Sequence, residues 1–194
     1  AVSFVEEHHA SNLAKVEGGI ASSLAEVRDL LPTGDWVIKA PFSASGQHRI
    51  RGQGPLAERE ISWITRQLKM GAVVVQPWHE RVLDLSTQVV ITDDTVDVLG
   101  HTRFWTDAGG VYRGSLVGSW ATGLDSSLAR ALHGGGKGSD TAQLLMASAT
   151  TVGRWAQSLG YRGPLGVDAM VIRVDDEVKL RPILEVNPRF TMGR

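Results

Sequence analysis

The chain has 194 residues, of which 42% are hydrophobic and 21% charged, and its formal net charge at pH 7 is −1. This length allows one substantial domain or two subdomains, and the composition excludes a disordered or fibrous chain. The near-neutral charge argues against nucleic-acid binding, and the lack of cysteine excludes disulfides, thiolate zinc sites and cysteine nucleophiles. Oxygen or imidazole must therefore hold any metal, which favours Mg²⁺. No apolar run approaches the roughly 20 residues that span a bilayer, so we expect no membrane association and a cytoplasmic location.

The first part of the chain mixes helical and extended patterns. Ser23 and Glu26 form a capping-box pattern ahead of apolar residues spaced by three and four, which predicts a short helix to about Leu31. Proline and glycine residues separate the segments that follow. The predicted elements are this helix, a buried strand over 36–40, a polar loop over 43–52, a helix over 55–71 and a second buried strand over 72–76.

After Pro77 the pattern changes to extended segments joined by turn-forming residues. Asp93-Asp94 and the stretch 107–110 favour tight turns, so their flanking segments predict an antiparallel meander. The predicted elements are strands 83–92, 96–105 and 111–117, helices 126–133 and 141–159, and a closing hairpin of strands 166–174 and 178–187. The whole order predicts an α+β fold with a small lobe and a larger antiparallel sheet.

The closing hairpin carries Asp168 on one strand and Glu185 and Asn187 on the other. A two-residue turn at Asp176-Glu177 would place Asp168 directly opposite Glu185, on the face that Asn187 shares. Two carboxylates in an apolar hairpin repel each other unless a cation or a shared proton separates them, which favours a divalent metal. The alternatives are solvated residues on an exposed face, or a three-residue turn that pairs Asp168 with Leu184 and turns Glu185 away.

Lys39 ends the first apolar strand, immediately before a loop of small residues. A lysine in this position could neutralise phosphate charge, with Ser43, Ser45 and Gly46 supplying hydroxyl and backbone N–H donors. A strand-end lysine whose ammonium group reaches water explains the same position equally well.

Gln76-Pro77-Trp78 lies where the second buried strand meets the meander. Exposed backbone polar groups beside an aromatic ring suit an adenine ring, although a plain connector with a core tryptophan fits equally well. Glu80 and Asp84 follow closely, and either could accept a ribose hydroxyl. Arg103 and Arg113, on the meander strands, either orient an anionic substrate or face solvent.

Taken in order, four segments resemble motifs of the ATP-grasp superfamily. They are 37–41, 74–78, 166–168 and 184–189. The last is the most specific, because carbamoyl phosphate synthetases and biotin carboxylases present magnesium ligands in the same Glu-x-Asn-Pro-Arg pattern. The resemblance covers roughly residues 20–194. It implies an ATP-grasp fold in which a small α/β lobe, 20–78, and a larger antiparallel-sheet lobe, 79–194, hold ATP between them, after a segment 1–19 left from a preceding domain.

The resemblance also implies a role for each candidate residue. The expected catalytic residues are Lys39, on the ATP phosphates, and Arg189, near the transferring phosphate or the substrate carboxylate. The other expected contacts are Ser43, Ser45 and Gly46 over the phosphates, the backbone of Gln76, Pro77 and Trp78 on adenine, Asp84 or less closely Glu80 on ribose, and Asp168, Glu185 and Asn187 on Mg²⁺, with Mn²⁺ as the alternative metal.

The function implied is an ATP- and Mg²⁺-dependent ligase that activates a carboxylate as an acylphosphate for attack by an amine or similar nucleophile. The expected partners are these small molecules and a preceding domain of the full-length protein, with no nucleic acid and no membrane. Two alternatives stay open, namely an ATP-dependent phosphotransferase and a non-catalytic nucleotide-binding regulatory module. Members of the family carry a second phosphate-facing lysine well before the strand lysine, and Lys15 lies too close to Lys39 to match it clearly. The lack of a clear match favours the regulatory alternative.

Overall fold

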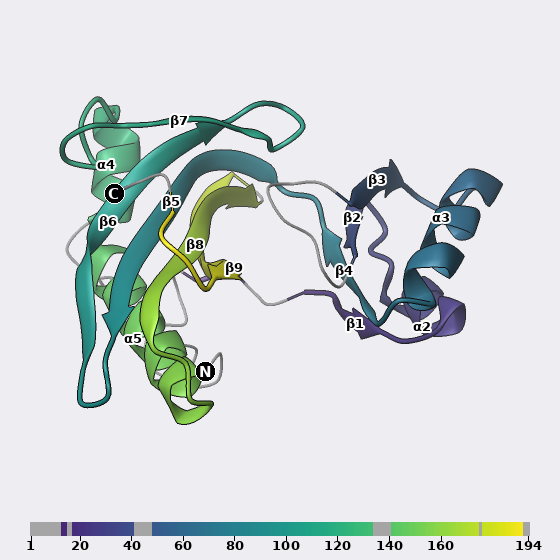
Figure 1. Ribbon diagram of the computed structural model, residues 1–194. Coiled ribbons are helices and arrows are strands. Elements are labelled where there is room, and N and C mark those ends of the chain that lie inside the picture. The colour runs from purple at the N-terminus through teal and green to yellow at the C-terminus, as the bar shows by residue number, and fades with distance from the viewer. Residues whose placement is uncertain (1–12, 15–16, 41–47, 134–140, 175, 192–194) are drawn as a thin grey trace. The chain divides into compact units, whose positions relative to one another are not determined.

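The computed structural model describes residues 13–14, 17–40, 48–133, 141–174 and 176–191. The chain divides into two compact units. The small unit comprises 16–79 and 110–112, and the large unit comprises 1–15, 80–109 and 113–194. Each unit has its own sheet, of four strands in the small unit and five in the large one (Figure 1). The α+β class is confirmed, and the division lies next to the boundary after Trp78 that the sequence predicted.

The small unit consists of one antiparallel sheet and two helices. Its elements are β1 (Gly19–Ala21), α2 (Leu24–Leu30), β2 (Asp35–Lys39), β3 (Arg49–Gln53), α3 (Glu58–Leu68) and β4 (Val73–Pro77), with strand order β1-β4-β2-β3. One of the two bonds of the predicted capping box is present at the start of α2, and the other comes from the residue before the N-cap. Ser23 Oγ accepts the Glu26 N–H at 3.2 Å, and the Glu26 carboxylate accepts the Ser22 N–H at 2.7 Å. The first predicted helix is thus confirmed together with the contacts that begin it.

Both helices of the small unit pack on the same face of its sheet. The core on this face consists of Ala21, Val27, Trp36, Ile38, Ile64, Val73 and Val75, which are all fully buried. Because successive side chains of a strand point to opposite faces, the residues between these strand positions point to the other face. Val37 and Lys39 of β2 and Gln76 of β4 therefore share the face of the sheet that α2 and α3 leave open.

The sequence prediction of a polar loop over 43–52 is wrong in its last part. Residues Arg49–Gln53 form β3, which pairs with β2 as an antiparallel hairpin, while 41–47 lie outside the described residues. Only Ile50 of this strand packs against the core. At the other core-facing position, Gly52, an added Cβ would lie 2.3 Å from the Trp36 ring. The glycine therefore makes room for the tryptophan. With only one apolar side chain, the strand lacks the alternation of apolar and polar residues by which a strand is recognised in a sequence.

We expect Gly52→Ala to destabilise the small unit by about 1–3 kcal/mol, because the new methyl group would overpack the Trp36 ring. Chemical unfolding would measure the change. Gly34→Ala is the matched control, since nothing lies within 4 Å of the position where its Cβ would be added. Equal effects of the two substitutions would contradict this packing role.

The large unit is built on a five-stranded antiparallel sheet with strand order β7-β6-β5-β8-β9. Its elements are β5 (Glu80–Ile91), β6 (Val96–Thr106), β7 (Tyr112–Ser115), α4 (Ser126–Leu132), α5 (Thr141–Ser158), β8 (Gly163–Val174) and β9 (Glu177–Asn187). The predicted meander and closing hairpin are confirmed, and β8 joins them by pairing with β5. At the edge of the sheet, the Ala14 N–H donates to the Leu180 carbonyl of β9 at 2.8 Å.

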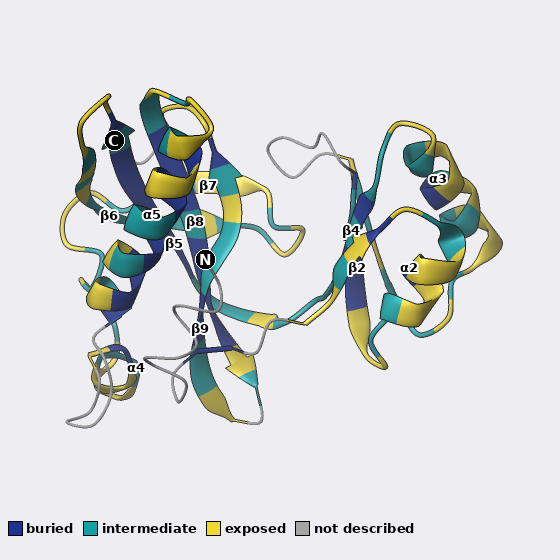
Figure 2. Ribbon diagram, turned by 90° about the horizontal axis from the view of Figure 1, so that it is seen from below, coloured by how far each residue is buried: buried dark blue, intermediate teal, exposed yellow. Residues whose placement is uncertain are grey.

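The helix α5 covers one face of the large sheet. Ala149, Val152 and Ala156 of the helix form a core cluster with Leu165 and Val167 of β8 and with residues of β5. In Figure 2 the buried residues run along β5 and β8 and along the side of α5 that meets them. The odd-numbered residues of β8 thus face the helices. The even-numbered residues, including Asp168, face the opposite side of the sheet.

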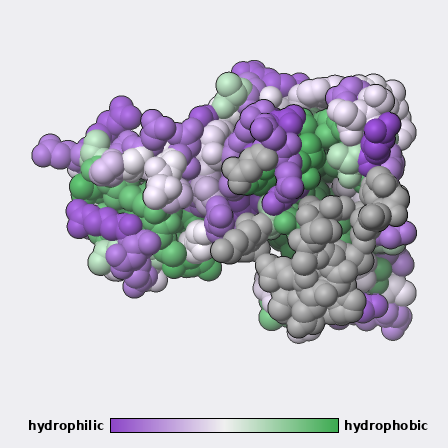
Figure 3. Space-filling model, turned by 180° about the vertical axis from the view of Figure 1, so that it is seen from behind, coloured by the Kyte–Doolittle hydropathy of each residue, from purple (hydrophilic) through white to green (hydrophobic). Residues whose placement is uncertain are grey.

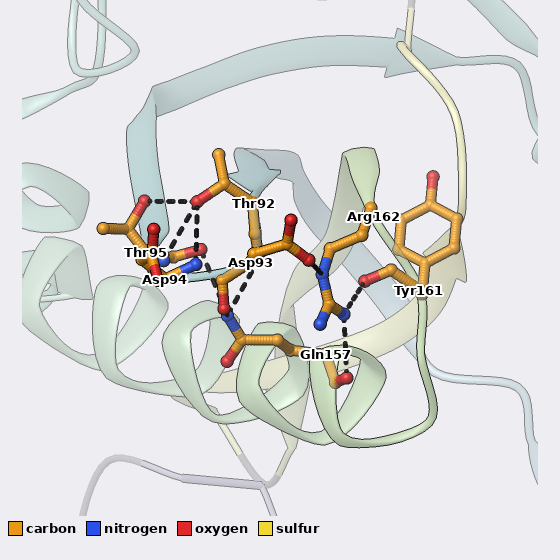
Figure 4. A network of polar contacts seen from close by, with 7 residues as sticks. All are labelled: Thr92, Asp93, Asp94, Thr95, Gln157, Tyr161 and Arg162. Atoms are coloured by element: carbon orange, nitrogen blue, oxygen red, sulfur yellow. Dashed lines mark hydrogen bonds and ion pairs between the residues drawn. The ribbon is translucent and has the colours of Figure 1, made fainter.

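The far end of α5 is fixed to the β5–β6 turn by polar contacts (Figure 4). Gln157 Nε2 donates to the carbonyls of Thr92, at 3.0 Å, and Asp93, at 3.2 Å. Arg162 Nε forms an ion pair with Asp93 Oδ1 at 2.8 Å. These contacts join the helix to the hairpin tip, so the helix and the sheet of the large unit form one framework for the residues on the open face.

None of the helices in the described parts of the chain is long and apolar enough to cross a membrane. On the face seen in Figure 3, hydrophilic side chains and apolar areas are both exposed. Some large apolar side chains are exposed on each unit, among them Ile20 of the small unit and Leu159 of the large unit.

Candidate functional site

The register of β8 and β9 places Asp168 directly opposite Glu185, and Gly166 opposite Asn187. This confirms the pairing that the sequence predicted, although the predicted turn is wrong by one residue. Val174 pairs with Glu177, so the turn ends before Glu177. With this turn alone, Asp168 would pair with Ile183, and a later irregularity in β9 restores the pairing with Glu185.

The irregularity is a bulge in β9 that contains Pro182. Met170 pairs with Arg181 and Asp168 with Glu185, so the residues 182–184 lie opposite Ala169 alone. A bulge is one of the few strand positions that tolerate a proline, which has no N–H for the ladder. Because two residues are added, the alternation of side chains is preserved and Glu185 stays on the face of Asp168.

Asp168 accepts hydrogen bonds from two neighbouring strands. Ser86 Oγ on β5 donates to Asp168 Oδ1 at 2.7 Å, and Asn187 Nδ2 on β9 donates to Oδ2 at 2.9 Å. Gln88 Nε2 in turn donates to Ser86 Oγ at 2.9 Å, and Arg189 donates to Asn187 Oδ1 at 3.2 Å. With Glu185 opposite, these side chains form what we call the Asp168 network: Ser86, Gln88, Asp168, Glu185, Asn187 and Arg189.

Burial raises the pKa of Asp168 above its ordinary value. The Ser86 hydrogen bond lowers this pKa, and the charge of Glu185 raises it again. Asp168 is only partly exposed and Asn187 is buried, whereas Glu185 reaches solvent. The network therefore holds a desolvated carboxylate beside a second carboxylate, and a bound cation would relieve both the desolvation and the repulsion.

The oxygen atoms of the Asp168 network suit a hard divalent cation. Within the described residues no three His, Asp or Glu side chains gather in one group, so two carboxylates would need an amide as the third ligand. Asn187 is the amide in place, but its Nδ2 rather than its oxygen faces Asp168. Ligation by Asn187 Oδ1 together with Asp168 therefore requires this amide to turn by about 180°, which exchanges the positions of its nitrogen and oxygen.

The segment after β9 lies over the sheet beside Asp168. A Cβ added at Gly166 would lie 2.4 Å from Thr191 Cγ2, so glycine at this position allows the segment to approach β8. The Arg189 N–H donates to the Asn187 carbonyl at 2.8 Å and closes a tight turn. This turn keeps the exposed Arg189 guanidinium next to Asn187.

The open face of the small sheet is cationic. Lys39 of β2 pairs directly with Arg49 of β3, and Arg51 follows Arg49 on the same face. Like charges directly opposite each other in a sheet are destabilising. Three basic side chains on one face suit an anionic ligand, as the phosphate role predicted for Lys39 requires. Ser43, Ser45 and Gly46, predicted to join Lys39, lie outside the described residues.

The segment Gln76-Pro77-Trp78 is already partly engaged within the small unit. The Trp78 N–H donates to the Asp35 carbonyl at 2.8 Å, and the Arg51 guanidinium carbon lies 3.8 Å from the centre of the Trp78 ring. Pro77 has no N–H. An adenine ring would therefore be recognised through the other backbone groups of this segment, or would displace Arg51 from the tryptophan.

The two acidic candidates for ribose binding differ in accessibility. Glu80 is exposed and lies 3.5 Å from Arg173. Asp84 is buried, forms an ion pair with Arg81 and accepts a hydrogen bond from Thr106 Oγ1 at 2.8 Å. Burial raises the pKa of Asp84 even though the Arg81 charge lowers it. Of the two carboxylates, Glu80 is thus the one that can accept a ligand hydroxyl without breaking a buried ion pair.

The sequence prediction omitted four polar residues of these faces. Ser86 and Gln88 are spaced by two on a predicted strand, which is the signal for one shared face, but their contact with Asp168 depends on the pairing of β5 with β8. Arg49 and Arg51 show the same spacing inside a segment taken for a loop. Tertiary pairing, rather than local sequence, brings each of these residues to its site.

We expect Asp168→Asn to raise the melting temperature at neutral pH when no divalent metal is present. The pKa of Asp168 is higher in the folded state than in the unfolded state. Ionisation therefore lowers the free energy of unfolding as the pH increases from the ordinary aspartate pKa through the raised pKa, and has no such effect at lower pH. The variant lacks this cost, so its stability advantage over the wild type should grow across that range in thermal unfolding. Asp94→Asn, at an exposed position in the β5–β6 turn, is the control. Parallel curves for Asp168→Asn and the wild type would contradict the prediction.

Comparison with known proteins gives a remote relative and a widespread architecture. No family model matches the chain. Over 156 residues it is 26% identical to the [butirosin acyl-carrier protein]–L-glutamate ligase of Niallia circulans, a match that covers 80% of this chain and 33% of that protein. The chain thus spans about a third of the length of this curated relative.

Solved structures match nearly the whole chain. N5-carboxyaminoimidazole synthetase from Staphylococcus aureus, in complex with ADP, superposes with a TM-score of 0.59 at 11% identity, over 98% of this chain and 44% of that one. The biotin carboxylase domain of 2-oxoglutarate carboxylase from Hydrogenobacter thermophilus, in complex with MgADP and bicarbonate, gives 0.57 at 15% identity, over 98% and 39%. At identities this low, the TM-scores show a common fold and do not assign roles to individual residues.

Proposed function

We propose that this chain, which has the ATP-grasp fold its motifs predicted, is the catalytic part of an ATP- and Mg²⁺-dependent ligase. The observation that carries the proposal is the convergence of Asp168, Glu185 and Asn187 on one face of β8 and β9. Two carboxylates and an amide supply oxygen ligands to Mg²⁺, and the repulsion between the carboxylates favours the bound state. When bound, Mg²⁺ would neutralise charge on the phosphates of ATP.

The proposed reaction gives a role to three basic residues. Lys39, supported by Arg49, binds phosphate oxygens through charge-assisted hydrogen bonds. Arg189, next to Asn187, orients the transferring phosphoryl group or the substrate carboxylate. An oxygen of that carboxylate attacks the γ-phosphorus while the bond to ADP breaks, which gives an acylphosphate. An amine then attacks the acyl carbon, and inorganic phosphate leaves.

We propose a small carboxylate and a small nucleophile as the substrates. The curated relative is named as an L-glutamate ligase that acts on an acyl-carrier protein, so an amino acid is the first substrate to test. Because the chain spans a third of that relative, we also propose that a preceding domain of the full-length protein contributes to substrate choice. The reaction uses cytoplasmic ATP and Mg²⁺, and we place the enzyme in that compartment.

We expect the double variant Glu185→Gln/Asn187→Ala to abolish thermal stabilisation by Mg-ATP and to lower ATP turnover at least about 100-fold. The expected magnitude reflects the several kcal/mol by which a metal stabilises transition-state charge. Glu177→Gln, an exposed glutamate at the other end of β9, is the matched control. Stabilisation by Mg-ATP that survives in the double variant would rule out this metal assignment. ADP release that needs no nucleophile would instead identify a phosphotransferase.

We expect Lys39→Met to weaken ATP binding about tenfold or more, because a hydrogen bond to a charged group contributes about 1.5–3 kcal/mol. Equilibrium binding of ATP with and without Mg²⁺ would measure the effect. Lys69→Met, at an exposed position that follows α3 in the same unit, should bind ATP as the wild type does. An unchanged affinity in Lys39→Met would remove Lys39 from the phosphate site.

A further inference from the structure

A pocket of about 320 Å³ lies in the large unit where the ladder between β5 and β6 ends. The last pair of this ladder is Asp84 with Phe104, and both strands continue beyond it along the pocket. The segment 123–128, at the start of α4, forms another part of the wall. Its lining includes Arg81, Asp84, Arg103, Trp105, Leu124 and Asp125.

Arg103 is the unusual residue of this pocket, because its side chain is buried and lacks a counter-charge. It is only 9% exposed, and its Nε atom has no hydrogen-bond partner. Across the ladder it pairs with Leu85, whose side chain lies in the core beneath the helices. Its guanidinium lies near the ring of Trp105, with the guanidinium carbon 5.9 Å from the ring centre. The sequence left open whether Arg103 faces solvent, and its burial answers that question.

The other charged side chains of the pocket already have partners. Arg81 forms an ion pair with Asp84. Asp125 accepts the N–H groups of Ser127 and Leu128, each at 2.9 Å. Among the described lining residues, Arg103 is thus the cation without an acidic partner. A buried charge that is not compensated is costly and calls for an ion of opposite sign.

We propose that this pocket binds the carboxylate of a small organic acid through Arg103. A planar guanidinium recognises carboxylate and phosphate alike, and Arg103 is the cation of the described lining that has no acidic partner. A carboxylate brings one negative charge, whereas a phosphate dianion would bring two to a pocket that Asp125, whose partners are neutral N–H groups, already lines. Leu124 offers apolar contact to the carbon atoms of such a ligand.

The proposed site is distinct from the Asp168 network. Arg103 shares the helix-covered side of the sheet with Leu85, whereas Asp168 lies on the opposite face. Carboxylate binding at Arg103 therefore does not depend on the proposed ligase reaction. It can be measured on the 194-residue chain without ATP or metal.

Calorimetric titrations with acetate, L-glutamate and inorganic phosphate would test the proposal. We expect saturable binding of at least one carboxylate, and at least about tenfold weaker binding in Arg103→Met, because a charged hydrogen bond is lost. Arg113→Gln is the matched control, since Arg113 lies on the neighbouring β7, is exposed and pairs with Asp107 at 2.7 Å. Phosphate binding that equals or exceeds carboxylate binding would overturn the carboxylate assignment.

The Nε–H resonance of Arg103, assigned by its loss in Arg103→Lys, provides a second readout on the wild-type protein. We expect a downfield shift that saturates with the bound carboxylate, because the N–H gains an acceptor. Arg103→Met should melt no lower than the wild type when no anion is added, since it removes an uncompensated buried charge. No shift with either carboxylate, or a marked loss of stability in Arg103→Met together with no carboxylate binding, would make Arg103 a structural residue and overturn the proposal.

Discussion

The Asp168 network depends on the pairing of two carboxylates across β8 and β9. Asp168 is largely removed from water, and its two oxygens are satisfied by Ser86 and Asn187, yet Glu185 directly opposite adds a like charge that these neutral donors do not cancel. Hydrogen bonds compensate for lost hydration, whereas only a positive charge compensates for repulsion. The arrangement is therefore least favourable when the metal-free protein holds both carboxylates ionised, and a divalent cation removes this cost.

The same logic applies to two further places in the fold. Lys39 and Arg49 face each other across β2 and β3, and Arg103 is buried without an acidic partner among the described residues. Each place either brings like charges together or buries a charge that has no oppositely charged partner among the described residues, and such places are candidates for ligand binding. The three sites differ in sign and in chemistry. In the proposed assignments, oxygen ligands suit a hard cation, the basic side chains of the small sheet suit phosphate, and the buried guanidinium suits a carboxylate.

The sequence predicted the elements of this fold better than their partners. Apolar periodicity located α2, α3 and the long strands, and the motif at the end of β9 identified Glu185 and Asn187 as neighbours of Asp168. The sequence could not reveal β3, which has one apolar side chain. A glycine stands at its other core-facing position, where it makes room for Trp36. Nor could the sequence bring Ser86 to Asp168, since the pairing of β5 with β8 joins segments 82 residues apart. Even the register of the hairpin followed from two features that compensate, an earlier turn and a bulge at Pro182.

The bulge and the orientation of Asn187 together suggest how the site tolerates its metal-free state. The two added residues keep Glu185 opposite Asp168, while the Asn187 amide presents nitrogen to the carboxylate and oxygen to Arg189. In that orientation the amide nitrogen and the amide oxygen each have a hydrogen-bond partner, and Arg189 is held beside Asn187. Turning the amide would present oxygen to a cation and, in the same movement, release the Arg189 guanidinium from its acceptor. If Mg²⁺ binds as proposed, the orientation of this one amide would link metal binding to the contact that holds Arg189.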